Sequence, residues 1–221
     1  MTATVPTNLP ATGPAGDVTP TSARTTRLLL GCGVVAGPLY LVTGFAQAFT
    51  RDGFDLARHP FSFLSLGDGG WLQIANFVLC GLLFLASAVG LRRTGAIGTW
   101  APVLVAVFAV GMIGGGVFVA DPAFGFPAGA PEGQAAELSW HGVLHGVAFF
   151  VGFPALVASF FVLARKLPGP WARASVVAGV LSLAPVPFLG TGFGTVLLYG
   201  GAVVGWLWAS AVAAKLRSAT R

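Results

Sequence analysis

Residues 51–76 read RDGFDLARHPFSFLSLGDGGWLQIAN, a polar segment between two long apolar stretches. The segment holds three aspartates, two arginines, one of the three histidines of the chain and several hydroxyl side chains. Water or lipid headgroups solvate such a segment, whereas the hydrocarbon core of a bilayer does not. We therefore predict that the flanking stretches cross a membrane and that this segment folds at the outer face of the resulting bundle.

The composition of the chain supports a membrane environment. Of its 221 residues, 55% are hydrophobic and 9% are charged, whereas about 25% of the residues in a soluble domain are charged. We therefore expect most of the protein surface to face lipid. The net charge of +5 does not indicate a nucleic-acid partner, because the basic residues stand at the ends of apolar runs and form no basic patch with interleaved aromatic side chains.

Six apolar runs have lengths near the 20 or so residues that a membrane-spanning helix needs. We predict an all-α, polytopic membrane protein that forms a bundle of six transmembrane helices. Pro185 and Pro187 should bend or break the outer end of the fifth helix, because proline lacks a backbone N–H. The predicted spans are 28–49, 71–91, 100–120, 141–164, 175–189 and 196–214, with a disordered N-terminal tail over 1–27 and a short C-terminal tail over 215–221.

The distribution of charge along the chain predicts its orientation. If both termini are cytoplasmic, ten of the twelve Lys and Arg residues lie inside and only Arg51 and Arg58 lie outside, whereas six of the seven acidic residues lie outside. Cytoplasmic loops of membrane proteins carry an excess of Lys and Arg near the helix ends. We therefore predict a multi-pass protein of the cell (plasma) membrane with both tails in the cytoplasm.

The polar side chains gather at the predicted outer end of the bundle. His141 and His145 are one helical turn apart on one face of the fourth span, and Ser139 suits the N-cap of that helix. No Asp, Glu, Lys or Arg lies in the middle of a span, which argues against a proton pump or an ion-coupled transporter. The candidate ligand-binding residues of this outer polar cluster are Asp55, His59, Ser65, Asp68, Asn76, Asp121, His141 and His145.

Part of the outer polar cluster has the composition of a zinc site. Three imidazoles and one carboxylate are suitable ligands for tetrahedral Zn²⁺, and a zinc-bound water there would attack an ester or amide of a lipid headgroup. However, no Glu general base stands beside the HxxxH pair. We therefore expect a hydrogen-bonded cluster without a cofactor and keep zinc as the alternative. The four residues concerned are His59, Asp121, His141 and His145.

Two local patterns predict contacts within the protein. Asp55 and Arg58 are close enough in sequence to form an ion pair that stiffens the outer segment. Glycines spaced i, i+4 on a helix form a groove that lets another backbone approach closely. Such glycine pairs are Gly33/Gly37, Gly111/Gly115, Gly142/Gly146 and Gly201/Gly205.

Three blocks of sequence carry a family resemblance. They are GFDLARHPFSFLSLGDGGWLQIANFVLCGLL (53–83), FVADPAFGFPAGAP (118–131) and SWHGVLHG (139–146). With them the chain, over about residues 28–214, resembles the actinobacterial branch of the domain of unknown function 998 family, which are bacterial and archaeal integral membrane proteins with about six spans. The resemblance implies a multi-pass membrane protein and no assigned activity. A more distant likeness, to the ceramidase and progestin-receptor superfamily with its zinc-bound HxxxH helix, is an analogy.

Three functions are compatible with these observations. The leading interpretation is a membrane protein that binds a lipid headgroup or another small ligand in an outward-facing polar pocket, with no chemistry of its own. The first alternative is a zinc-dependent hydrolase that acts on a lipid at the same face. The second alternative is an accessory subunit whose glycine-rich helix faces bind another membrane protein or a second copy of the chain. Membrane lipid is the partner common to all three.

Overall fold

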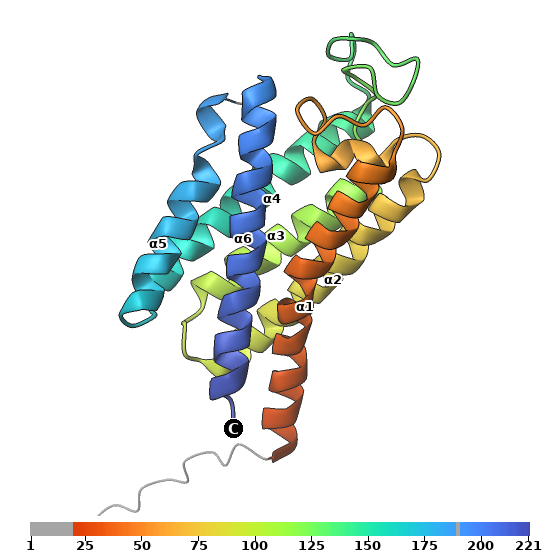
Figure 1. The fold of residues 1–221 in the computed structure, drawn as a ribbon. Coiled ribbons are helices and arrows are strands. Elements are labelled where there is room, and N and C mark those ends of the chain that lie inside the picture. The colour runs from red at the N-terminus through yellow and green to blue at the C-terminus, as the bar shows by residue number, and fades with distance from the viewer. Residues whose placement is uncertain (1–19, 189–190) are drawn as a thin grey trace, which may run out of the picture.

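The structure is a computed structural model that describes residues 20–188 and 191–221, and these residues form an all-α fold without strands (Figure 1). Two short 3-10 helices, η1 and η2, accompany the α-helices. Six helical segments are long and apolar enough to cross a membrane, which confirms the predicted fold class. The elements in chain order are α1 (Pro20–Thr50), η1 (Phe61–Ser65), α2 (Gly70–Thr94), α3 (Trp100–Val117), α4 (Trp140–Ala164), α5 (Pro170–Leu183), η2 (Val186–Phe188) and α6 (Gly192–Ala219).

The helices form a closed ring in which each helix packs on its sequence neighbours and α6 packs back on α1. Segments 51–69 and 118–139 lie together at one end of the bundle, here called the loop end (Figure 1). The start of α1, the α2–α3 and α4–α5 turns and the end of α6 lie at the opposite end, here called the basic end. The segments that hold the outer polar cluster are therefore on one side of the fold.

The ends of several helices differ from the predicted spans. α1 begins at Pro20, eight residues before the predicted start, because Arg93 of α2 holds its first turns through the hydroxyls of Ser22 and Thr26. The predicted disordered tail therefore does not extend over 20–27, and the remainder of that tail lies outside the described residues. The C-terminal tail is also largely helical, because α6 continues to Ala219.

The prolines after α5 have the predicted effect. α5 ends at Leu183, and the segment that contains Pro185 and Pro187 forms a separate 3-10 turn, η2. A helix loses a backbone hydrogen bond at each proline. The fifth span is therefore a broken helix, whose apolar length reaches Phe188 only when η2 is included.

Close packing of α1 on α6 confirms the interpretation of the Gly33/Gly37 pair. The hydroxyl of Ser210 on α6 donates to the carbonyl oxygen of Gly33 at 2.8 Å and accepts from the N–H of Gly37 at 3.2 Å. A Cβ at Gly37 would overlap the backbone of Trp206. Glycine thus lets a side chain of one helix insert into the backbone of the other.

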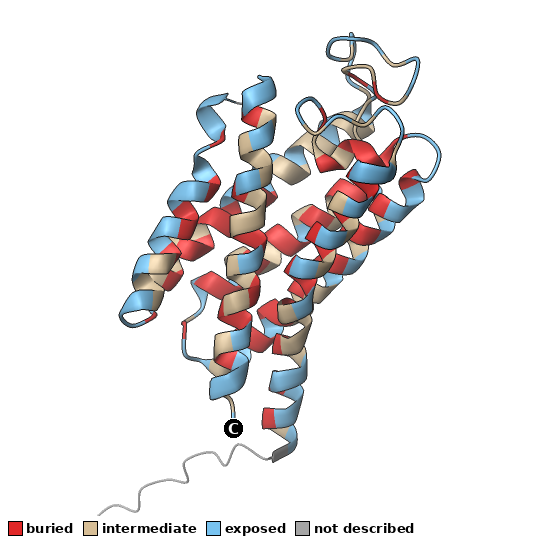
Figure 2. Ribbon diagram, in the orientation of Figure 1, coloured by how far each residue is buried: buried red, intermediate tan, exposed pale blue. Residues whose placement is uncertain are grey.

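Buried residues line the inside of the bundle and exposed residues its outside (Figure 2), and large apolar side chains occur in both groups. Trp206 lies at the centre of the interior, with the ring centroids of Tyr40 and Phe108 at 5.4 and 5.0 Å from its own. On the outside, large apolar side chains such as Val42 (68% exposed) and Phe49 (74% exposed) face away from the protein. Such extensive apolar exposure is stable in lipid and not in water.

Candidate functional site

Three residues of the predicted outer polar cluster, Asp121, His141 and His145, lie at the junction of α3 and α4. The carboxylate oxygens of Asp121, just after α3, accept hydrogen bonds from the backbone N–H and the hydroxyl of Ser139 at 2.9 and 2.6 Å. Ser139 is the N-cap of α4, as predicted, because its Oγ accepts from the N–H of Gly142 at 3.0 Å. A side chain at Gly142 would overlap the carboxylate, so this glycine lets the acid approach the positive end of α4.

Ser139 also contacts His141, but the order of contacts is not that of a serine nucleophile. Its Oγ lies 2.9 Å from Nδ1 of His141. In a hydrolytic triad the imidazole stands between the carboxylate and the serine and accepts the serine proton. Here the serine stands between the other two groups and donates its hydrogen to Asp121. This geometry makes Ser139 a capping residue that holds Asp121 and His141 in place.

The two histidines of α4 are oriented through their Nδ1 atoms. Nδ1 of His145 lies 2.8 Å from the carbonyl oxygen of Phe118, and Nδ1 of His141 lies 3.2 Å from that of Val119. A carbonyl oxygen only accepts hydrogen bonds, so Nδ1 carries the hydrogen in both rings and Nε2 of the neutral ring keeps its lone pair. α3 ends at Val117, before the predicted end of the third span, and this earlier end frees both carbonyl groups.

A cavity of about 380 Å³ lies beside His145, between α3, α4 and α6. Residues of η1 form its wall toward the loop end, and most of the other walls are aromatic or aliphatic. Phe150 lines the cavity and is also 67% exposed, so the cavity opens on the lateral surface of the bundle. The volume lies within the range of about 300–1,000 Å³ that is typical of ligand pockets.

A few polar groups reach the otherwise apolar wall of this cavity. His145 provides the imidazole, and Ser62 provides a hydroxyl from η1. The indole Nε1 of Trp206 is buried and has no hydrogen-bond partner among the described residues. The hydroxyl of Tyr199 donates to the carbonyl oxygen of His59. The polar groups that the cavity wall offers to a ligand therefore include the imidazole of His145 and the hydroxyl of Ser62.

A comparison with protein families finds one match. Residues 34–215 match the family described as protein of unknown function, DUF998. The chain belongs to the DUF998 family. No curated protein and no solved structure matches the chain. The family description assigns no activity.

In this DUF998 protein His59 connects the two loop-end segments. The side chain is 2% exposed, and its Nδ1 accepts from the N–H of Asp55 at 2.9 Å. Its Nε2 lies 2.9 Å from the carbonyl oxygen of Phe124 and therefore donates to it. The ring also packs against Phe63 and Phe126, at centroid distances of 6.0 and 5.4 Å. Both ring nitrogens of His59 are thus used to hold backbone.

The structure does not bring the four predicted zinc ligands into one group. Among the residues that the structure describes, no three His, Cys, Asp or Glu side chains are placed to hold a metal ion. His59 uses both ring nitrogens, and Asp121 uses both oxygens, for hydrogen bonds within the protein. Of the four, His141 and His145 have an Nε2 with no hydrogen-bond partner among the described residues. Zinc binding stays a prediction that rests on these two.

The acidic residues of segment 51–69 lie apart from the cavity. Asp55 and Asp68 are exposed, and the Oδ1 of Asp55 accepts from the N–H of Ala57 at 2.8 Å, which stabilises a turn. Arg58 pairs with Glu132 of the other loop-end segment at 3.2 Å. The predicted Asp55–Arg58 ion pair is therefore wrong, because the chain folds the second loop against the first and supplies another carboxylate.

Asn76 and Ser65 are buried beneath the loops of this DUF998 protein. Asn76 donates to the backbone of Tyr40 and to Oε1 of Gln73, both at 3.1 Å, and Gln47 of α1 donates to the same Oε1 at 2.8 Å. The buried hydroxyl of Ser65 has no partner among the described residues. The amide network joins α1 to α2. The predicted cluster did not include Gln47. Its position near the outer end of the first span was a usable signal, because Gln73 stands near the outer end of the second span, which runs antiparallel to the first.

Proposed function

We propose that this DUF998 protein is a plasma-membrane protein that binds an amphiphilic molecule, foremost a membrane lipid, in the cavity between α3, α4 and α6. The cavity carries this proposal, because it combines apolar walls, a lateral opening beside Phe150 and an imidazole toward the loop end. A lipid that diffuses in the bilayer reaches such an opening without leaving the membrane. The apolar chain of the ligand lies along the aromatic walls and its polar group lies near His145.

Two polar side chains of the cavity wall define the chemistry of the ligand. Nε2 of His145 accepts a hydrogen bond, which a hydroxyl or ammonium group of the ligand donates. The hydroxyl of Ser62 donates a hydrogen bond, which a carbonyl oxygen of the ligand accepts. A lipid with a hydroxylated headgroup and an ester or amide carbonyl has both groups.

The charge distribution supports an orientation with both termini in the cytoplasm. Among the described residues, ten Lys and Arg stand at the basic end, whereas Arg51 and Arg58 stand at the loop end. Positive residues near helix ends favour the cytoplasmic side. In this orientation the cavity lies in the outer half of the bundle, and its ligand comes from the outer leaflet.

A substitution that fills the cavity without disturbing the fold tests the proposal. Gly146 lines the cavity, and a Cβ added there meets no atom within 4 Å, so Gly146→Phe places a ring into free space. Gly200→Phe on α6 is the matched control, because Gly200 also has open space and does not line the cavity. Lipids that co-purify with each variant after mild detergent extraction are measured by native mass spectrometry.

We expect Gly146→Phe to lose the bound amphiphile and Gly200→Phe to retain it at the level of the unchanged protein. His145→Ala should weaken binding about tenfold, because a hydrogen bond in an apolar site is worth about 1–1.5 kcal/mol. Equal amounts of the same lipid in Gly146→Phe and the control would show that the cavity is not the binding site.

A zinc-dependent hydrolase is the second candidate, and the orientation of His141 and His145 favours it. A metal-bound histidine usually donates its other ring N–H to a backbone carbonyl or a carboxylate, as Nδ1 does in both residues. Elemental analysis of purified protein tests this candidate. Stoichiometric zinc that disappears in the double variant His141→Ala/His145→Ala supports it, and protein that binds no zinc from zinc-containing buffer contradicts it.

A further inference from the structure

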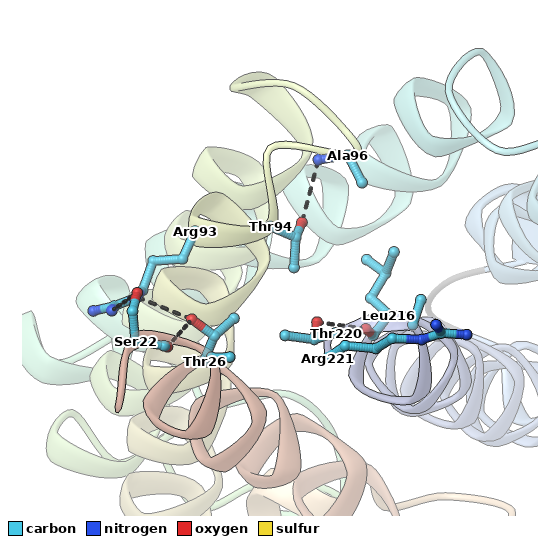
Figure 3. Close-up of a pocket in the computed structure, with 10 residues that line it drawn as sticks. Ser22, Thr26, Arg93, Thr94, Ala96, Leu216, Thr220 and Arg221 are labelled. Carbon is cyan, nitrogen blue, oxygen red and sulfur yellow. Dashed lines mark hydrogen bonds between the residues drawn. The ribbon is translucent and has the colours of Figure 1, made fainter. Parts of the chain in front are cut away.

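A second hollow lies at the basic end of the bundle, opposite the cavity beside His145. It has a volume of about 420 Å³ and lies between the start of α1, the α2–α3 turn and the end of α6 (Figure 3). The hydroxyl side chains of Ser22, Thr26, Thr94 and Thr220 line it, together with Arg93 and Arg221. Polar side chains thus replace the aromatic walls of the other cavity.

Arg93 is fixed at one wall of this hollow. Its Nε donates to the hydroxyl of Thr26 at 3.1 Å and its Nη2 donates to the hydroxyl of Ser22 at 3.3 Å (Figure 3). The hydroxyl of Thr26 is itself buried and donates to the carbonyl oxygen of Ser22 at 2.9 Å. A guanidinium group has five N–H donors, and the others have no acceptor among the described residues. The side chain is therefore held in place with unused donors.

Among the described residues, the side-chain charges around the hollow are all positive. Ten Lys and Arg residues stand at the basic end, and no described residue there carries a side-chain carboxylate. The ion pair formed by the described residues, Arg58–Glu132, is at the loop end. Exposed arginines usually pair with carboxylates or with solvent, whereas Arg93 is anchored by neutral hydroxyls. Its positive charge is thus available to an anion.

The length of α1 places the hollow at the level of lipid headgroups. A helix of 31 residues is about 46 Å long at 1.5 Å per residue, whereas the hydrocarbon core of a bilayer is about 30 Å thick. The first turns of α1, which contain Ser22 and Thr26, therefore extend beyond the hydrocarbon. Leu216 and Ala219 of α6 add an apolar wall on the side of the membrane.

We propose that this hollow binds the phosphate group of an anionic phospholipid. Arg93 donates to the phosphate oxygens through its free N–H groups, and the hydroxyl of Ser22, which accepts from Arg93, stands beside it as a further donor. Basic pockets between transmembrane helices are typical sites for anionic headgroups. The site is separate from the cavity beside His145, and neither site depends on the other.

The experiment compares two neighbouring arginines of the full-length protein in detergent. Arg93→Gln removes the anchored guanidinium, and Arg92→Gln removes an exposed one that does not line the hollow. Phosphatidylglycerol and phosphatidylcholine are titrated separately, and bound lipid is counted by native mass spectrometry. We expect phosphatidylglycerol binding to fall about fivefold in Arg93→Gln, the effect of losing one basic contact, and to remain unchanged in Arg92→Gln.

A second pair of variants keeps the bonds of Arg93 intact. Thr220→Asp places a negative charge in the hollow and should also weaken phosphatidylglycerol binding, whereas Ser218→Asp, an exposed position outside the hollow, should not. If the two variants of each pair lost phosphatidylglycerol binding equally, the lipid would be attracted to the basic end as a whole, and the proposal would be overturned. Equal binding of phosphatidylglycerol and phosphatidylcholine would also overturn it. A competition with millimolar inorganic phosphate distinguishes a site for the lipid from a site for the free anion. Displacement of the bound phosphatidylglycerol would identify a site for free phosphate.

Discussion

The loop end and the basic end of this bundle use their polar side chains in opposite ways. At the loop end, His59 and Asp121 direct both of their polar atoms to groups of the protein itself. At the basic end, Arg93 bonds two neutral hydroxyls, and no described carboxylate side chain stands near the ten basic residues. The loop end is thus held by directional hydrogen bonds, whereas the charges of the basic end have no carboxylate side chain beside them among the described residues.

This difference separates polar residues that build the fold from those that remain free for a ligand. A polar group that already has its partners gains little from a ligand, because binding only exchanges one hydrogen bond for another. His59 and Asp121 are therefore structural. Among the described residues, Nε2 of His145 and the guanidinium of Arg93 retain unused hydrogen-bonding capacity. These two groups are the candidate ligand contacts.

The largest expected effect is an all-or-none difference in cysteine labelling between the two ends of the bundle. It tests whether the loop end and the basic end face opposite sides of the membrane. Asp52→Cys at the loop end and Arg92→Cys at the basic end are exposed positions. With both termini in the cytoplasm, a membrane-impermeant maleimide should label Asp52→Cys in intact cells and label Arg92→Cys only after permeabilisation. The native Cys32 and Cys80 are replaced by Ser in both proteins. The reverse pattern would invert the orientation, and labelling of both in intact cells would refute the charge argument.

The next largest effect concerns the stability of the loop end. His59→Ala leaves the N–H of Asp55 and the carbonyl of Phe124 without their partners and removes a buried ring. We expect the free energy of unfolding in detergent to fall by about 3 kcal/mol. Arg58→Ala, which breaks the exposed pair with Glu132, should cost less than about 1 kcal/mol. Similar losses in the two variants would show that the buried imidazole does not hold the loops together.

The smallest effect concerns the cap of α4. Ser139→Ala removes the hydroxyl that bonds Gly142 and Asp121, and should lower the free energy of unfolding by about 1 kcal/mol. Asp121→Ala should cost more, because both of the bonds that it loses to Ser139 are made to a carboxylate, and such charge-assisted bonds are stronger. The double variant should cost less than the sum of the two, since both substitutions remove a shared bond. Strictly additive losses, measured by the same unfolding assay, would contradict the capping arrangement.

Local signals in the sequence predicted several features of the site. Apolar length predicted six spans, Pro185 and Pro187 predicted the break after α5, and Ser139 was predicted as the N-cap of α4. Each of these features depends on residues a few positions apart. The predicted partner of Arg58 was wrong because Glu132 belongs to a distant segment. The neighbours of a surface charge depend on how loops fold together, and a single sequence does not contain that information.

The sequence by itself determined the fold class, the number of spans and the segregation of charge. The length of an apolar run and the positions of charged residues can be read from the chain, and the bilayer favours the one inside the membrane and the other outside it. Only the tertiary structure decided which polar groups are already used. The packing of the two loop-end segments gave His59 two backbone partners, and the early end of α3 oriented the imidazoles of α4. Hydrogen bonds are short and directional, so their partners follow from how the helices and loops pack.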